Sequence, residues 1–382
     1  MKLIALGSLI SFLLCFYAIP VIIFIANKKK LYDVPDERKA HTKPISSLGG
    51  LGIFAGFVMA LLLCSYTNIT QSFQFIIASF MVVFFFGIKD DILVLSPLKK
   101  FIGQLITAFI LVFKAKLVIT DMHGFLTIGA INETTSYILT IFTILVVMNA
   151  YNLIDGVDGL GGTVGVITSG FFGFFFFLNG DLFYSLMGFA FASSLLGFLI
   201  YNYSPAKIFM GDTGAMLSGV VNAILVIHFI ETAQGSQIFP FSSSPAMGFG
   251  ILIMPLLDTL RVFAIRIVHG RSPFSPDRNH LHHLLLDRGM NHNKVTLTIA
   301  SSCIFFIFFT YNFLQFGTTL VILAQIVIFF GGILVLYFIK PKDTGNIKVV
   351  KGNFNEPNLN EKKSKTAFSV IGNNATIIDE QE

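Results

Sequence analysis

The sequence predicts an all-α polytopic membrane protein, a bundle of about eleven transmembrane helices. Hydrophobic residues make up 54% of the chain and charged residues only 12%, whereas a soluble domain carries about 25% charged residues. The apolar runs are about 18–24 residues long and do not alternate, which suits helices crossing a bilayer rather than the strands of a barrel. The three cysteines lie inside these runs, where we expect buried thiols and no disulfides.

The first apolar run resembles a signal peptide, but it is long, lacks a small-residue cleavage site and is followed by Lys28-Lys29-Lys30. We therefore expect a retained helix. Between two later runs, the segment 119–136 is expected to form a small hairpin. The predicted spans are 3–26, 48–66, 72–88, 100–118, 137–150, 160–178, 183–201, 213–231, 247–267, 295–312 and 318–339. Residues 1–340 thus form the membrane domain, and the polar segment 341–382 is expected to be a mostly disordered tail.

The positive charges favour one side of this bundle. Of the 26 Lys and Arg residues, 23 fall in the tail, in loops or at the adjoining span ends that the prediction places on the same side. By the positive-inside rule this side is cytoplasmic, and an odd number of spans then puts the N-terminus outside and the C-terminus inside. This topology accounts for the net charge of +5, which therefore does not indicate nucleic-acid binding.

The first two cytoplasmic loops carry residues suited to phosphate chemistry. Lys43 precedes Pro44 and the pair Gly49-Gly50 at a helix mouth, where an ammonium group suits phosphate binding. The alternative is a basic flank that stops membrane transfer. Asp90 and Asp91 are neighbouring carboxylates that repel each other at a membrane boundary, which suits a general base or a partner for a divalent cation. An ordinary solvated helix end is the alternative there.

The third loop, Asn149–Gly162, repeats amides and carboxylates at three-residue spacing. Asn149, Asn152 and Asp155 would share one helix face, and Asp158 continues the series. Glycines in the Asp-Gly-x-Asp-Gly repeat allow the backbone to turn beside a ligand. Carboxylates next to spanning sequence mark a functional site by default. A loop whose polar residues only cap helices would need one such residue, not four.

The fourth loop places Asp212 after a glycine at the start of a helix. Phe209 is a candidate for stacking on a base, and Asn202 is close in sequence. The alternative is that Asp212 only caps its helix.

The fifth loop holds His280, His282 and His283 among the arginines 271, 278 and 288. The His-x-His-His spacing does not match the usual zinc sites. We therefore expect an anion-binding lid for phosphates.

Together the five loops predict a polyanionic ligand bridged by a divalent cation. Mg²⁺ takes few carboxylates plus phosphate oxygens, which matches scattered Asp residues better than a dedicated cage does. Mn²⁺ is the alternative ion. A polyphosphate beside a bilayer suggests transfer to or from a lipid phosphate.

In this order the loops resemble the polyprenyl-phosphate N-acetylhexosamine-1-phosphate transferases, the superfamily that includes phospho-N-acetylmuramoyl-pentapeptide transferase. The resemblance covers roughly residues 1–340. Its matching pieces are Arg-Lys-x-His-x-Lys-Pro-x-x-x-x-Gly-Gly (38–50), Asp90-Asp91, Asn149–Gly162, Phe-Met-Gly-Asp-Thr-Gly (209–214) and Ser-Pro-Phe-Ser-Pro-Asp-Arg-Asn-His-Leu-His-His (272–283). The pentapeptide transferases carry His-His-His-Phe-Glu in the last motif. This chain is therefore more similar to the enzymes that take UDP-N-acetylglucosamine or a related UDP-N-acetylhexosamine.

The resemblance implies a reaction at the cytoplasmic face of a bacterial plasma membrane. The phosphate of undecaprenyl phosphate attacks the sugar-bearing phosphorus of the UDP-sugar, and UMP leaves, with Mg²⁺ neutralising the diphosphate. The product would start a cell-envelope polysaccharide such as an O-antigen, common-antigen or teichoic-acid chain.

The same resemblance implies roles for the motif residues. Asp212 is the first choice for a Mg²⁺ ligand, with Asn152 beside it. Asp90 and Asp91 handle the lipid phosphate, one of them as a base if one is needed, while Asp155 and Asp158 position the uridine and diphosphate. The remaining residues bind substrate: Phe209 stacks on uracil, Asn202 and Asn149 support the pocket, and Lys43, His280, His282 and His283 hold phosphate or sugar groups.

The sequence leaves three alternatives open. A secondary transporter is a different class, but its site would lie near the bilayer midplane, whereas these polar residues lie at helix ends. The same chemistry with another donor, such as UDP-N-acetylmuramoyl-pentapeptide, is the second. An inactive relative with a binding role is the third, although no carboxylate of the pattern is missing. A homodimer is one assembly compatible with the sequence.

Overall fold

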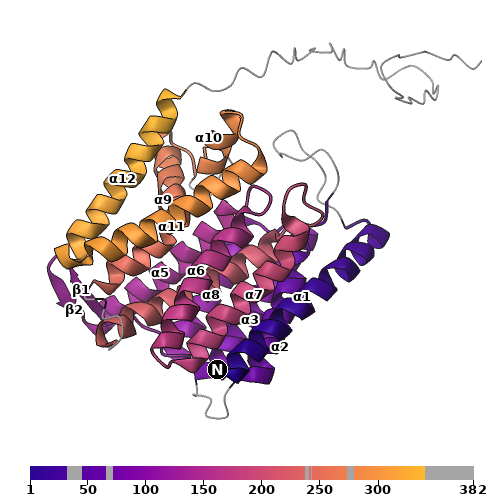
Figure 1. Ribbon diagram of the computed structural model, residues 1–382, viewed down its shortest axis with the longest axis horizontal. Coiled ribbons are helices and arrows are strands. Elements are labelled where there is room, and N and C mark those ends of the chain that lie inside the picture. The colour runs from indigo at the N-terminus through magenta and orange to yellow at the C-terminus, as the bar shows by residue number, and fades with distance from the viewer. Residues whose placement is uncertain (32–44, 66–71, 237–240, 242, 273–278, 340–382) are drawn as a thin grey trace, which may run out of the picture. The chain divides into compact units, whose positions relative to one another are not determined.

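Long helices account for most of the described chain. The computed structural model describes residues 1–31, 45–65, 72–236, 241, 243–272 and 279–339 (Figure 1). These residues all belong to one compact unit, Met1–Lys342. Lys43 and the predicted tail at 341–382 lie outside the described residues.

The helices follow the apolar runs closely. Their bounds are α1 Lys2–Lys29, α2 Gly49–Cys64, α3 Ser72–Leu93, α4 Pro97–Phe109, α5 Glu133–Ile154, α6 Leu160–Leu178, α7 Leu182–Asn202, α8 Gly211–Thr232, α9 Ser244–Val268, α10 Leu281–Asp287, α11 His292–Phe313 and α12 Thr318–Phe338. A π-helical turn, Ile110–Lys114, continues α4, and short 3₁₀ turns follow α8 and α11.

The prediction of an all-α polytopic membrane protein is confirmed. Each predicted span overlaps one helix, and within the described residues 8 helices are long and apolar enough to cross a membrane. The other predicted spans coincide with α2, which is shorter, with α4 and its π-helical continuation, and with α9. The short helix α10 does not follow from the apolar runs, because its seven residues are too few to form a run of spanning length.

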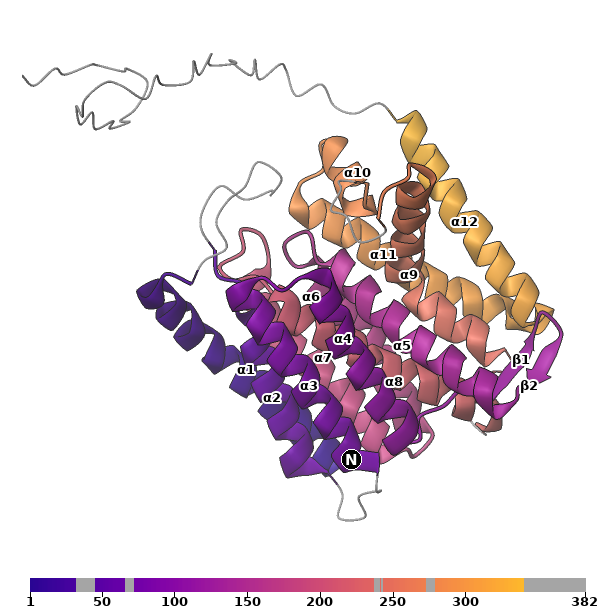
Figure 2. The ribbon, with the colours of Figure 1, turned by 180° about the vertical axis from the view of Figure 1, so that it is seen from behind.

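Helix α8 lies at the centre of the bundle, between α3, α5 and α7 (Figure 2). Of the residues in its apolar stretch 94% are buried, whereas in α1 and α12 the buried share is 22%. The outer helices thus keep large apolar side chains exposed, as contact with lipid requires. Small residues allow close packing on α8: a Cβ on Gly87 of α3 would lie 2.5 Å from Thr213 Cα. The end of α3 is thereby brought against the first turn of α8.

The predicted hairpin is confirmed. Strand β1, Asp121–Phe125, pairs antiparallel with β2, Ile128–Ala130. The hairpin is held against α12, because Thr318 Oγ1 donates to the His123 carbonyl at 2.7 Å. It adjoins the start of α5, whereas the motif residues Asn152 and Asp155 lie at the other end of that helix.

Candidate active site

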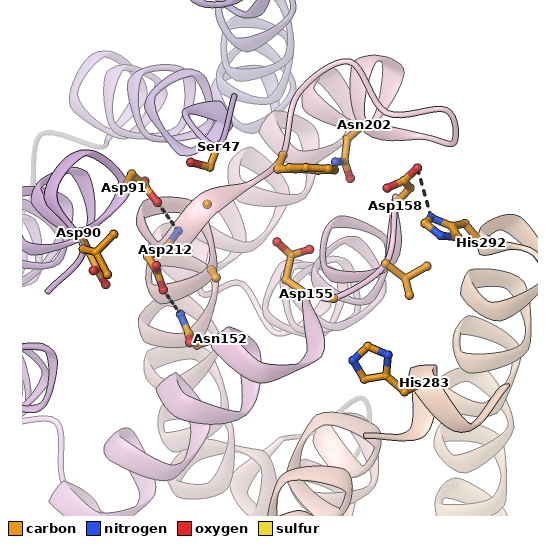
Figure 3. Close-up of a pocket in the computed structure, with 16 residues that line it drawn as sticks. Ser47, Asp90, Asp91, Asn152, Asp155, Asp158, Asn202, Asp212, His283 and His292 are labelled. Carbon is orange, nitrogen blue, oxygen red and sulfur yellow. Dashed lines mark hydrogen bonds and ion pairs between the residues drawn. The ribbon is translucent and has the colours of Figure 1, made fainter. Parts of the chain in front are cut away.

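The polar loops converge on a cleft of about 460 Å³ (Figure 3). It lies where α3, α5 and α7 end and α8 and α11 begin. Its lining residues are Ser47, Asp90, Asp91, Val94, Asn152, Asp155, Gly156, Val157, Asp158, Asn202, Phe209, Gly211, Asp212, Ala215, His283 and His292. Most of the residues singled out in the sequence are thus brought together.

Backbone pairing places the segment that carries Asp212. The Phe209 N–H donates to the Ser46 carbonyl at 2.8 Å, and the Gly49 N–H returns a bond to the Phe209 carbonyl at 2.9 Å. Gly211 then adopts φ +71°, and a Cβ there would lie 1.9 Å from the Ser47 carbonyl oxygen. Only glycine fits this turn without strain, so the motif before Asp212 has a backbone reason for its glycine.

Asp91 caps the N-terminus of α8. Its Oδ1 accepts from the Asp212 N–H at 2.6 Å, and its Oδ2 accepts from Thr213 N–H at 3.1 Å and from Thr213 Oγ1 at 2.5 Å. A carboxylate here satisfies orphan amides and complements the helix dipole. Both oxygens of Asp91 are therefore engaged in holding the helix that carries Asp212.

Asp90 has a different set of partners from its neighbour. Its Oδ1 accepts from the Leu95 N–H at 2.6 Å, and its Oδ2 contacts the ammonium of Lys100. The Lys100 Nζ also lies 3.2 Å from Asp212 Oδ1. Sequence reasoning missed Lys100 as a site residue, because in the sequence it stands out only as one of the positive charges that set the topology. The sequence feature that could have indicated this role is that Lys100 follows the Asp90-Asp91 pair at the other end of the same loop.

Asp212 and Asn152 offer adjacent oxygen-bearing groups at the cleft. Asn152 Nδ2 donates to Asp212 Oδ1 at 2.6 Å (Figure 3). The Asp212 side chain is 29% exposed, so it remains accessible from the cleft. Among the residues that the structure describes, no three His, Cys, Asp or Glu side chains form a ready-made metal cage. One carboxylate with an amide beside it fits Mg²⁺, which completes its shell with waters and phosphate oxygens.

Asp155 and Asp158 differ in their electrostatics. Burial, with the nearby charges of Asp212 and Asp158, raises the pKa of Asp155 to about 7, against a bond from the Gly161 backbone that lowers it. Burial also acts to raise the pKa of Asp158, but the hydrogen bond and charge of His292, together with bonds from Ala206 N–H and the Ser204 side chain, outweigh it, so that this pKa is lowered. Asp155 is thus the carboxylate in this loop that changes charge near neutral pH.

Asp158 and Asn202 join the loops around the cleft. Asp158 Oδ2 accepts from the Ala206 N–H at 3.2 Å and lies 3.2 Å from His292 Nδ1. The buried Asn202 accepts from the Gly159 N–H at 2.9 Å and donates to the Ile208 carbonyl at 2.8 Å. His292 lines the cleft and was missed in the sequence, since it lies beyond the fifth motif at the start of α11.

Three described residues proposed as substrate-binding do not line the cleft. Asn149 instead donates to Gln104 Oε1 at 2.9 Å and to the Leu145 carbonyl at 2.8 Å. His280 and His282 are buried behind the cleft wall, and burial lowers the pKa of His282 to about 3, so it is neutral. Of the predicted histidine lid, only His283 lines the cleft.

The arginines of that lid do not gather at the cleft either. Arg288 donates through Nε to the Leu336 carbonyl at 2.6 Å and through Nη1 to the Leu284 carbonyl at 2.7 Å, so it ties α10 to α12. Arg271 is not among the lining residues, and Arg278 lies outside the described residues.

Comparison with known proteins gives consistent matches. The model of glycosyl transferase family 4 matches residues 72–230. Decaprenyl-phosphate N-acetylglucosaminephosphotransferase of Mycobacterium leprae is 32% identical over 335 residues, which cover 79% of this chain and 84% of the relative. An undecaprenyl-phosphate alpha-N-acetylglucosaminyl 1-phosphate transferase of Salmonella typhi is 31% identical over 309 residues, 78% of this chain and 81% of the relative. A probable undecaprenyl-phosphate N-acetylglucosaminyl 1-phosphate transferase of Bacillus subtilis is 30% identical, with 78% and 81% covered.

Proposed function

The chain belongs to the family of polyprenyl-phosphate N-acetylglucosamine-1-phosphate transferases, and we propose that it transfers N-acetylglucosamine 1-phosphate from UDP-N-acetylglucosamine to undecaprenyl phosphate. The relatives' names include both decaprenyl and undecaprenyl phosphate as acceptors. The observation that carries the proposal is the convergence of Asp212, Asn152 and Asp155 on one cleft at the helix ends. A diphosphate substrate and a lipid phosphate could meet there beside the bilayer.

In the proposed reaction an oxygen of the lipid phosphate forms a bond to the β-phosphorus of the UDP-sugar. The bond from that phosphorus to the bridging oxygen breaks, and UMP leaves with the electron pair. Near neutral pH the lipid phosphate is already largely ionised, so no base is required for the attack. This suits the occupied state of Asp90 and Asp91, whose oxygens already serve Lys100, Leu95 and the first turn of α8.

Asp212, with Asn152 beside it, would hold Mg²⁺, or Mn²⁺ in its place, and the bound ion would neutralise the diphosphate and stabilise the UMP leaving group. Lys100 adds a fixed positive charge 3.2 Å from Asp212 Oδ1.

Phe209 offers a ring for the uracil, and Asn202 holds the loop next to it through a hydrogen bond to the Ile208 carbonyl. His283 and His292 line the opposite wall, where they would contact phosphate or sugar groups.

The proposed location is the plasma membrane of a bacterium, with the cleft on its cytoplasmic face. Support comes from the excess of Lys and Arg in the loops at the cleft end, which by the positive-inside rule favours the cytoplasm. The N-terminus would then lie outside and the bundle would cross the bilayer about eleven times.

The decisive test is a transfer assay on the purified full chain with Mg²⁺ and undecaprenyl phosphate. Labelled UDP-N-acetylglucosamine, UDP-N-acetylgalactosamine and UDP-N-acetylmuramoyl-pentapeptide are compared, and UMP release is measured. We expect labelled lipid and stoichiometric UMP with UDP-N-acetylglucosamine. Transfer from another donor alone would correct the sugar and keep the chemistry. No transfer from any donor, with lipid and metal shown to be competent, would reject the proposal.

A further inference from the structure

A buried ionic network lies behind the cleft wall, between α9 and the start of α10. Asp258 of α9 is 3% exposed, and its Oδ2 lies 2.9 Å from His280 Nδ1. Its Oδ1 accepts from the Leu281 N–H at 2.9 Å and from Arg261 Nη2 at 2.9 Å. A carboxylate buried this deeply is tolerated because these charged and polar donors replace its water.

The network fixes the backbone at the start of the histidine segment. Leu281 is the first residue of α10, so Asp258 caps that helix from a different element. Arg261 also contacts the Asn279 carbonyl through the same Nη2 that bonds Asp258. The chain is therefore held at 279, 280 and 281, immediately before His282 and His283.

The held segment in turn positions the cleft wall. The rings of His280 and His282 stack at 5.6 Å and 3°, and those of His282 and His283 lie 4.4 Å apart. His282 fits against Gly156, where a Cβ would lie 2.3 Å from His282 Nε2. His283, next along the chain, lines the cleft. A path of direct contacts thus joins Asp258 to the cleft without Asp258 itself lining it.

We infer that Asp258, with Arg261 as its counter-ion, is a positioning residue that sets His283 at the cleft and so acts on the transfer without touching substrate. The inference deepens the proposed function and rests on it for its effect on turnover. In metal sites, removal of an outer partner that orients a ligand costs roughly 10- to 100-fold in metal affinity or activity, and we expect an effect at the lower end of that range here.

The test is a double-mutant cycle on the full chain in detergent. The variants are Asp258→Asn, His283→Ala and the double variant. Asp181→Asn is the matched control, because Asp181 Oδ2 lies 2.7 Å from His228 Nε2, a carboxylate–histidine pair outside the cleft. We expect Asp258→Asn and His283→Ala each to lose about tenfold in kcat/KM. The double variant should lose about the same tenfold, because both changes remove one contribution. The control should keep wild-type kcat/KM.

Losses that multiply to about a hundredfold in the double variant would overturn the inference, since Asp258 would then act independently of His283. So would an Asp258→Asn enzyme with wild-type kinetics. If Asp258→Asn does not fold, Arg261→Lys takes its place in the cycle. That variant keeps the positive charge but loses the guanidinium Nη2 that bonds both Asp258 and the Asn279 carbonyl.

Amide hydrogen exchange separates this inference from the proposed function. Asp258→Asn should speed exchange in residues 279–285 and leave α8 unchanged, whether or not the protein transfers a sugar phosphate. If the wild type transfers nothing, the proposed function fails, and hydrogen exchange alone tests whether Asp258 holds residues 279–281. Unchanged exchange in 279–285 would show that Asp258 does not hold this segment, even in an active enzyme.

Discussion

Carboxylates that look equivalent in the sequence have different partners in the fold. Asp90 and Asp91 are adjacent, yet one pairs with Lys100 and the other caps α8. Asp155 and Asp158 are three residues apart, yet the pKa of the first is raised to about 7 and that of the second is lowered. The residue type determines which chemistry a carboxylate can perform. The helix N-terminus or the cation that contacts the carboxylate determines its charge state and its role.

Asp212→Asn tests the proposed metal site. The amide keeps the shape and can still meet Asn152 and Lys100, but it loses the charge that a divalent cation requires. We expect kcat to fall by at least about a hundredfold, the order lost when one charge-stabilising contact leaves a transition state. The measurement is labelled-lipid formation across a Mg²⁺ series, with elution profile and thermal midpoint as folding controls. Near-normal turnover would remove Asp212 from the metal role.

The raised pKa of Asp155 predicts a pH-dependent stability. Because the folded-state pKa is about 7, above the usual 3.8, the folded protein holds a proton that the unfolded chain releases. The stability from this group is complete below about pH 4 and is lost as the pH rises through 7. Asp155→Asn should therefore raise the thermal midpoint relative to wild type by roughly 5 °C at pH 7.5 and hardly at all at pH 4.

Asp158→Asn provides the comparison of opposite sign. Its folded-state pKa is lowered, so its stabilising effect is present above the unfolded pKa and is lost as the pH falls. This variant should be less stable than wild type at pH 7.5, and the difference in thermal midpoint should shrink as the pH falls below the ordinary pKa of 3.8. Parallel pH profiles for the two variants would contradict the assigned environments.

At the scale of elements, the site depends on how the first turn of α8 is held. Gly211 combines φ +71° with a position where a Cβ would lie 1.9 Å from the Ser47 carbonyl oxygen. Gly124, in the hairpin, has φ +78° with nothing within 4 Å of its Cβ position. Substitutions at Gly124 and Gly211 therefore distinguish the effect of backbone strain alone from that of strain combined with a steric clash beside Asp212.

Gly211→Ala should therefore lose most transfer activity and lower the thermal midpoint clearly, whereas Gly124→Ala should keep activity. The hairpin variant bears only the left-handed penalty, about 1 kcal/mol. The measurements are kcat/KM and thermal unfolding of both variants. Equal losses in the two would show that φ alone matters and that the contact between Gly211 and Ser47 does not.

Helix positions could be predicted from the sequence, because spanning segments need long apolar runs and each run overlaps one helix. The clustering of motif residues at one cleft could also be anticipated, since they end or begin such runs. The particular residues that each motif side chain contacts could not be predicted. Asp91 bonds a backbone N–H 121 positions away, and Asn152 bonds a side chain 60 positions away. Such pairings follow from helix packing, which local pattern does not encode.

At the scale of the whole molecule, the bundle separates a polar cleft end from a hairpin end, and the proposed orientation, based on the positive-inside rule, turns the cleft end toward the cytoplasm. Single cysteines can test this in the natural background, because Cys15, Cys64 and Cys303 are at most 1% exposed. Lys207 lies in an exposed loop beside the cleft, and Gly129 lies in the hairpin with open space around it.

We expect Gly129→Cys, but not Lys207→Cys, to react with a membrane-impermeant maleimide in intact cells. In inverted vesicles the order should reverse. Since neither position lines the cleft, both variants should keep transfer activity, which shows that the labelled molecules are folded. Labelling of Lys207→Cys from outside would invert the proposed orientation and place the donor site away from the cytoplasmic UDP-sugar pool. Labelling of both from the same side would mean that the hairpin and the cleft do not lie on opposite faces of the membrane.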